Sequence, residues 1–167
     1  MPSTYTPIAT TTLGSAASSV TFSSISGSYT DLILVMNVGG SVSGNAMNMT
    51  FNSDTSTNYS DTGLWGTGSS AASGRHSNAT NAALSIGVGV STSASDTQTM
   101  VQIQNYSNTT TYKTYLARTG NTAGSYPGAE AIAGLWRSTA AITTVSVACG
   151  ANWVTGSTFT LYGVKSA

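Results

Sequence analysis

The chain has 167 residues, including 28 threonines and 27 serines, and only 6% of it is charged, against roughly 25% in an ordinary domain. Five Lys and Arg balance five Asp and Glu, so the composition excludes the basic surface of a nucleic-acid-binding protein. It also excludes a helical bundle, because the strong helix formers Leu, Glu, Lys and Arg are scarce.

Apolar and polar residues alternate along most of the chain, which predicts strands with one buried face. The segment 30–38 is apolar on both faces and predicts a central strand covered on both sides. The whole pattern is typical of an all-β protein, an antiparallel β-sandwich of about ten short strands. In chain order the strands are expected near 4–11, 18–25, 30–38, 46–52, 57–65, 82–90, 97–105, 111–118, 129–137, 142–148 and 157–165. Residues 128–136 also fit a helix.

The length predicts a single domain over residues 1–167. Residues 66–81 contain no large apolar side chain and are expected to form a long polar loop, which in a compact domain is functional or disordered. Residues 1–9 are interpreted as an N-terminal arm that lies on a neighbouring subunit. No secretory signal is expected, because residues 1–10 contain no basic segment followed by an apolar stretch. No membrane partner is expected either, because the longest apolar run, 32–36, is far shorter than a membrane span.

Residues that could carry chemistry are few. His76 is the only histidine and Cys149 the only cysteine, so one chain offers neither a disulfide nor a tetrahedral zinc site. Asp54 and Asp61 have no neighbours in the sequence that would push their pKa values apart, as a general acid and base require. We therefore predict no catalytic residue, no metal site and no cofactor, and we expect a protein that is not an enzyme.

One acidic segment has the outline of a calcium loop, because oxygen-bearing side chains recur at alternate positions over 52–58. Thr57 stands where such a loop requires glycine, and Gly63 stands where it requires a bidentate glutamate. A turn between two strands, in which Asp54 bonds its own backbone, explains the same residues without a metal.

The aromatic residues allow two interpretations that the sequence leaves open. Exposed rings on a β-sandwich would stack on sugars, whereas buried rings would pack in the core or between subunits. Trp65, together with Arg75 and His76 in the polar segment that follows it, forms the candidate contact surface.

Several short motifs are similar to those of a β-sandwich module found in virion structural proteins of marine tailed phages, cyanophages included. The resemblance covers nearly the whole chain, with 66–81 as its least familiar part. It implies a jelly-roll-like fold, assembly as a homotrimer and no catalytic group. The motifs are Thr10-Thr11-Thr12-Leu13, Val20-x-Phe22-x-x-Ile25, Tyr29-Thr30-Asp31-Leu32, Phe51-Asn52-x-Asp54, Asn58-Tyr59-Ser60, Ile103-x-Asn105-Tyr106, Tyr112-Lys113-Thr114, Trp136, Ile142-Thr143-x-Val145 and Gly156-Ser157-Thr158-Phe159-x-Leu161-Tyr162-Gly163.

Two functions follow from the resemblance and the composition. The first is a capsid decoration or cement protein, which stabilises the head by binding neighbouring subunits of the major capsid protein. The second is a tail or fibre tip that binds a host surface glycan. Both place the protein in the virion, after assembly in the host cytoplasm. So few charges favour association through apolar and Ser/Thr contacts, with weak dependence on salt.

Overall fold

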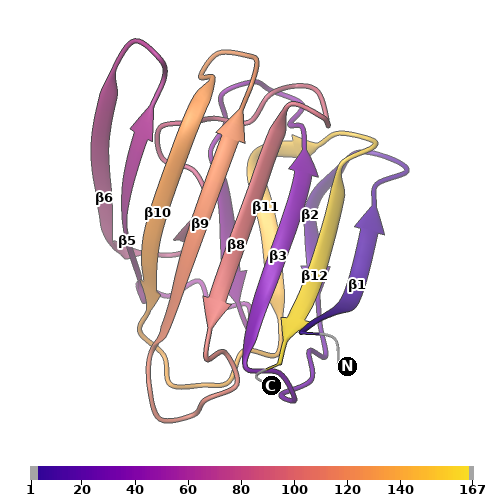
Figure 1. Ribbon diagram of the computed structural model, residues 1–167, viewed down its shortest axis with the longest axis vertical. Helices are drawn as coiled ribbons and strands as arrows, with labels where there is room; N and C mark the ends of the chain where they lie inside the picture. Colours follow the sequence, from indigo (N-terminus) through magenta and orange to yellow (C-terminus); the bar gives the residue numbers. More distant parts are fainter. Residues whose placement is uncertain (1–3, 166–167) are drawn as a thin grey trace.

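The computed structural model describes residues 4–165, and these residues form twelve strands and no helix (Figure 1). Every strand pair is antiparallel, which confirms the predicted all-β, antiparallel sandwich, with twelve strands in place of about ten. The strands are β1 (Tyr5–Thr12), β2 (Ala17–Phe22), β3 (Asp31–Val38), β4 (Met47–Phe51), β5 (Tyr59–Gly66), β6 (Ala71–Ala79), β7 (Ala82–Ala83), β8 (Thr97–Gln104), β9 (Lys113–Asn121), β10 (Gly128–Trp136), β11 (Val145–Trp153) and β12 (Thr158–Val164).

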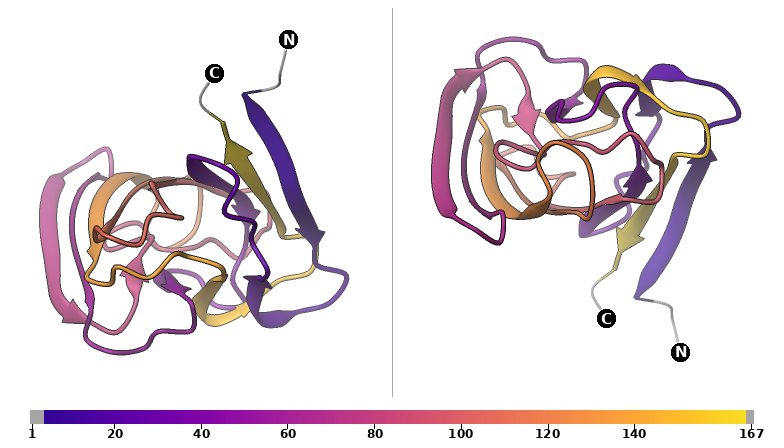
Figure 2. Two further views of the ribbon diagram at one scale, coloured as in Figure 1. Left: turned by 90° about the horizontal axis from the view of Figure 1, so that it is seen from below. Right: turned by 90° about the horizontal axis from the view of Figure 1, so that it is seen from above.

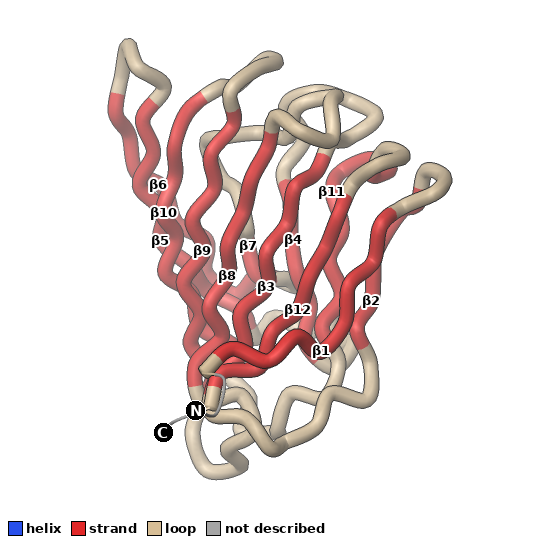
Figure 3. The backbone as a smooth tube through the Cα atoms, turned by 45° about the vertical axis from the view of Figure 1, so that its right-hand side comes forward, coloured by secondary structure: helices blue, strands red, loops and turns tan. Residues whose placement is uncertain are grey.

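The two sheets are unequal in size. The large sheet has eight strands in the order β1-β12-β3-β8-β9-β10-β5-β6, and the small one has four in the order β2-β11-β4-β7. The small sheet lies behind the large one in Figure 1, and Figure 3 shows the two layers from the side. In Figure 2, β1 and β12 lean away from the body of the sandwich at one edge, while β5 and β6 form the opposite edge.

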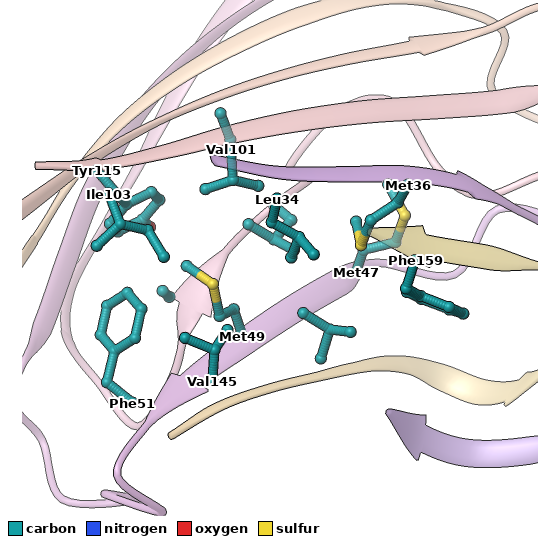
Figure 4. Packing of buried hydrophobic residues seen from close by; sticks show 14 of the residues in the cluster. Leu34, Met36, Met47, Met49, Phe51, Val101, Ile103, Tyr115, Val145 and Phe159 are labelled. Carbon is teal, nitrogen blue, oxygen red and sulfur yellow. The ribbon is translucent and has the colours of Figure 1, made fainter. Parts of the chain in front are cut away.

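The core lies between the sheets and is built from the alternate residues of each strand. Leu34 and Met36 of β3 point toward Met47 and Met49 of β4, as Figure 4 shows. Val101 of β8 lies beside them and is equally buried. Burial of side chains of this size contributes roughly 1.5–3 kcal/mol each, so this layer supplies most of the stability.

The prediction that 30–38 is covered on both sides is wrong. Leu32 and Leu34 are buried against the small sheet, but Ile33 and Val35 point to the other face and are only half-buried. The strand is central within its sheet, with β12 and β8 beside it, and no third layer covers its second face in the part of the chain described.

The predicted loop over 66–81 is instead a hairpin, because residues 71–79 form β6 and pair with β5. β6 is an edge strand with solvent on both faces, so it needs no large apolar side chain and carries no hydrophobic signal. The predicted strand over 82–90 is limited to β7. Beyond it, Leu84, Val88 and Val90 are buried, but the segment forms no continuous ladder. Its two ends are still hydrogen-bonded, since the N–H of Leu84 donates to the carbonyl of Met47 at 2.9 Å and that of Val90 donates to the carbonyl of Asn45 at 3.0 Å.

The predicted arm is also wrong where the structure describes it. Tyr5 to Thr12 form β1, which pairs with β12 over its full length and has a bulge between Pro7 and Ala9. Residues 1–3 lie outside the described part of the chain. The segment 128–136 is β10, a strand between β9 and β5, as the first of its two interpretations predicts.

Candidate interaction surfaces

The face of the large sheet that points away from the small sheet, here called the outer face, is rich in apolar side chains. Leu64 is 64% exposed, Leu116 45% and Met100 38%. The register places Val35, Met100, Arg118, Ala131 and Leu64 in one row across five neighbouring strands. A parallel row contains Ile33, Gln102, Leu116, Ala133, Thr62 and Arg75.

Two hollows shape this outer face. The larger has a volume of about 1080 Å³ and is lined by residues of the first row, including Leu64, Met100 and Arg118. The second has a volume of about 600 Å³ and includes Arg75 and Leu116. The outer face therefore combines an exposed apolar surface with a concave shape, which is typical of a surface that contacts another molecule.

The fully exposed charges of the described residues are all cationic. Arg75, Arg118 and Lys165 are exposed, whereas each of the five acidic side chains is buried or half-buried. The carboxylates accept hydrogen bonds from their own chain, namely Asp31 from Asn105, Asp54 from Ser56, Asp61 from His76, Asp96 from Ser91 and Glu130 from Ile86. A chain with no net formal charge thus has a surface whose free charges are positive.

Arg118 occupies the centre of the outer face without a carboxylate partner. Its Nη2 lies 3.2 Å from the Sδ of Met100, and within residues 4–165 the single ion pair is between His76 and Asp61. Arg75 lies on the same face, opposite Thr62. The outer face therefore offers two cations to a molecule that docks on it, while the half-buried Asp96 at the rim of the larger hollow accepts a hydrogen bond from Ser91.

The structure does not bring the three predicted contact residues together. Arg75 is on the outer face, but Trp65 and His76 belong to the alternate positions that face the other way. Trp65 packs against Gly87, where an added Cβ would lie 2.2 Å from the indole Cδ2. His76 contacts Asp61, so only one of the three residues belongs to the apolar outer face.

His76 and Asp61 form a pair between β6 and β5. The His76 Nδ1 lies 2.8 Å from the Asp61 Oδ1, and the Asp61 Oδ2 lies 3.4 Å from the backbone N of Ala83. The Asp61 side chain is fully buried and that of His76 is about half exposed. Within the described residues, no cluster of three His, Cys, Asp or Glu side chains could hold a metal. The arrangement ties the β5–β6 hairpin to Ala83 at the end of β7.

Glu130 holds the irregular segment that follows β7. Its Oε1 accepts the N–H groups of Ile86 and Gly87 at 2.9 and 3.0 Å, and its Oε2 accepts that of Val88 at 3.1 Å. Burial raises the pKa of this carboxyl and outweighs the three N–H groups, which lower it. The nearby Asp61 raises the pKa further. The side chain therefore satisfies three consecutive N–H groups that have no place in a strand ladder.

Lys113 and Arg137 use their charges inside the fold. The buried Lys113 Nζ donates to the carbonyl of Thr111 at 2.7 Å, and burial lowers its pKa. The Arg137 Nη2 donates to the carbonyl of Thr57 at 2.6 Å and to Asn78 Oδ1 at 2.9 Å. Both cations hold loops at the end of the sandwich where β9 begins and β10 finishes (Figure 1).

Asp54 lies in the turn between β4 and β5, as the metal-free interpretation predicts. Its Oδ1 accepts the N–H of Ser56 at 2.9 Å, and its Oδ2 accepts the Asn58 Nδ2 at 2.9 Å and the Trp136 Nε1 at 2.7 Å. Burial raises its pKa, but these hydrogen bonds outweigh burial and lower the pKa to about 2. The carboxylate fastens the turn to the core tryptophan.

This lowered pKa makes a testable contribution to acid stability. The contribution is complete above the ordinary value of 3.8 and is lost as the pH falls toward about 2, because the unfolded chain then binds the proton more tightly. We expect the free energy of unfolding to fall by about 1–2 kcal/mol in this window. Urea titrations at several pH values measure it. Asp54→Asn should be less stable at neutral pH and lose this part of the slope; an unchanged slope would contradict the prediction.

The outer-face residues Leu64, Met100, Leu116 and Arg118 were not among the predicted contact residues. Each stands at an outward position of a strand with clear alternation, so that alternation is the signal that could have found them.

No helix in the described residues is long and apolar enough to cross a membrane.

No protein-family model matches the chain, and no curated protein matches it. Among solved structures, the chain is compared with a protein described as a "putative pore-forming toxin from Bacteroides vulgatus", at 8% identity and a TM-score of 0.10. The match covers 85% of this chain and 60% of that protein, so the chain spans less than two thirds of its length. A likeness at this TM-score carries no argument about fold or function.

Proposed function

We propose that the protein is a non-enzymatic structural protein of a phage virion, and that it acts as a capsid decoration or cement protein. The observation that carries the proposal is the concave outer face, where Leu64, Met100 and Leu116 are exposed. A soluble monomer rarely exposes a broad apolar patch, so this face is suited to lie against another protein. The resemblance to virion modules supplies the biological setting.

The charge distribution indicates what kind of protein lies there. A second copy would bring only buried or half-buried carboxylates to Arg118, and each of them already accepts a hydrogen bond from its own chain. Leaving a buried charge without a partner destabilises an interface by several kcal/mol. The outer face therefore suits a different protein that carries carboxylates among apolar side chains, such as a capsid subunit.

The expected homotrimer would use other surfaces. The outward face of the small sheet carries hydroxyl groups, with Thr21 and Ser146 joined by a 2.8 Å hydrogen bond and Thr50 beside them. It lacks charged side chains and suits the Ser/Thr contacts between copies predicted from the composition. Light scattering should give a trimer at micromolar concentration, with little change on adding salt; a stable monomer would overturn this part of the proposal.

Particle binding tests the decoration role. Arg118→Glu should lower the occupancy of the protein on virions at least about tenfold, because it reverses the central charge of the docking face. Lys165→Glu is the control, because it makes the same charge change at an exposed residue outside the two rows of the outer face. The Lys165 Nζ lies 5.5 Å from the centroid of the Tyr29 ring. This variant should bind to virions normally. Occupancy is measured as the ratio to the major capsid protein. Normal occupancy of Arg118→Glu would contradict the docking face.

Copy number and position on the particle distinguish the two sequence-based functions. Hundreds of copies over the head, seen by electron microscopy, are expected for a decoration protein. A few tens of copies confined to the tail would contradict that role and favour a tail or fibre tip.

A further inference from the structure

A third hollow is lined by residues close to the ends of β3 and β5. Strands β3, β5 and β9 finish at the same end of the sandwich, as Figure 1 shows. The volume of the hollow is about 430 Å³, which lies in the range of roughly 300–1,000 Å³ usual for small-molecule sites. Four separate parts of the chain line it, represented by Gly44 after β3, Trp65 and Thr67 around the end of β5, Gly87 after β7, and Tyr126 between β9 and β10.

Two aromatic rings contribute to the wall of this hollow. Tyr126 is 55% exposed. Its loop is held in place by the N–H of Ser125, which donates to the Ser43 Oγ at 2.9 Å. An added Cβ on Gly44 would lie 2.8 Å from the Tyr126 Cδ2, and one on Gly87 would lie 2.2 Å from the Trp65 Cδ2. The two glycines let bare backbone approach the rings, and Gly44 also has the positive φ of 84° that favours glycine.

The wall is fixed from the core side. Glu130 accepts the N–H groups of Ile86, Gly87 and Val88, so the backbone that faces Trp65 cannot move without breaking three hydrogen bonds. A site whose wall is already ordered loses little conformational entropy when a ligand binds.

The chemistry of the lining selects a neutral ligand. Among residues 4–165, no Asp, Glu, Lys, Arg or His lines the hollow. Thr67 and Ser85 contribute hydroxyl groups, and three glycines, Gly44, Gly87 and Gly89, contribute peptide groups without side chains. An anion would find no cation there, whereas a neutral polar molecule could hydrogen-bond to the Thr67 hydroxyl.

We infer that this hollow, here called the Trp65–Tyr126 site, binds the ring of a neutral sugar. The C–H face of a pyranose would stack on an aromatic ring, and its hydroxyls would bond to the Thr67 hydroxyl and to glycine carbonyl groups of the lining. The site goes beyond the decoration role, because it shares only Trp65 with the larger hollow of the outer face and would serve a protein on the head or on the tail. Sugar binding and particle binding are measured separately, so one can fail without the other.

Tryptophan emission reports on this site selectively. Trp136 is 2% exposed and Trp153 is fully buried, whereas Trp65 lines the hollow. The probes are chitotriose, cellotriose and maltotriose as neutral sugars, with sialyllactose as the anionic comparison. We expect at least one neutral sugar to change the emission, and to protect Trp65 from acrylamide quenching, in a saturable way.

Two matched variants locate the binding. Tyr126→Ala should weaken the affinity roughly five- to tenfold, the effect of losing one aromatic contact. Tyr112→Ala removes a tyrosine that is also 55% exposed but lies where β9 begins, and it should bind as the unmodified protein does. Calorimetry gives both affinities, and the far-ultraviolet circular dichroism spectrum shows that each variant is folded.

Three outcomes would overturn the inference. They are no saturable change with any of the three neutral sugars, binding of sialyllactose alone, and unchanged sugar affinity in Tyr126→Ala. Trp65→Phe gives a further check by calorimetry, because it keeps a ring against Gly87 and should retain weakened binding.

Discussion

Replacing Trp136 by alanine is expected to lower the free energy of unfolding by about 3–5 kcal/mol, the largest effect of any single change considered for this protein. The indole is 2% exposed, its ring centroid lies 5.4 Å from that of Phe51 and 6.3 Å from that of Tyr59, and it stacks on Tyr59 at an interplanar angle of 19°. Alanine would leave a cavity at the end of β10 and would also remove the N–H that Asp54 accepts. Urea denaturation followed by circular dichroism measures the loss.

Trp136→Phe separates packing from hydrogen bonding. It keeps an aromatic ring against Phe51 and Tyr59 but has no N–H for Asp54, so its effect on stability should be smaller. The pKa of Asp54 should then rise toward its ordinary value, which weakens the acid-dependent loss of stability between pH 3.8 and about 2. A loss below about 1 kcal/mol in Trp136→Ala would show that the aromatic cluster is not a main source of stability.

Glu130→Ala is expected to lower the free energy of unfolding by about 2–4 kcal/mol, because three backbone N–H groups lose their acceptor. Glu130→Gln is the matched variant. Its amide oxygen can still accept from Ile86 and Gly87, while its NH₂ group faces the N–H of Val88, so the loss should be smaller. Hydrogen exchange should increase at all three amides in the alanine variant, and exchange unchanged from the original protein would contradict the proposed role.

Glu130 also predicts a pH dependence opposite in sign to that of Asp54. Burial raises its pKa above the ordinary 4.5, so the folded protein binds this proton more tightly than the unfolded chain does. The resulting stabilisation is complete below pH 4.5 and is lost as the pH rises through the raised pKa. In Glu130→Gln that decline should disappear, whereas a pH profile parallel to that of the original protein would rule the assignment out.

Alternation in the sequence predicted the strands that have one face on the core. Met47, Met49 and Phe51 of β4 are all fully buried. It missed β6, because an edge strand with Arg75 and Ser77 in solvent needs only backbone partners and carries no apolar pattern. Alternation also predicted a strand over 82–90, where only β7 forms. Buried and less buried side chains alternate there too, but Glu130 binds the backbone N–H groups in place of a neighbouring strand.

The interaction surfaces depend on contacts between distant parts of the chain. Arg118 and Leu64 meet on one face because β10 lies between β9 and β5, and strand order is not encoded in local periodicity. The sequence indicated Trp65 as a contact residue, and the structure places it in a hollow beside Tyr126. Tyr126 gave no signal, because its position depends on a loop that closes against Gly44.

The pairing of the first and last strands has a mechanical consequence. Tyr5 lies opposite Val164, so the outward ends of β1 and β12 leave the sheet side by side. A force that pulls these two ends apart would load the hydrogen bonds between β1 and β12 one after another, from Tyr5 toward Thr12. Such unzipping needs much less force than sliding two strands past each other, where all the bonds are loaded at once. The sheet would therefore yield first at this edge under tension, while β3, β8 and β9 remained paired.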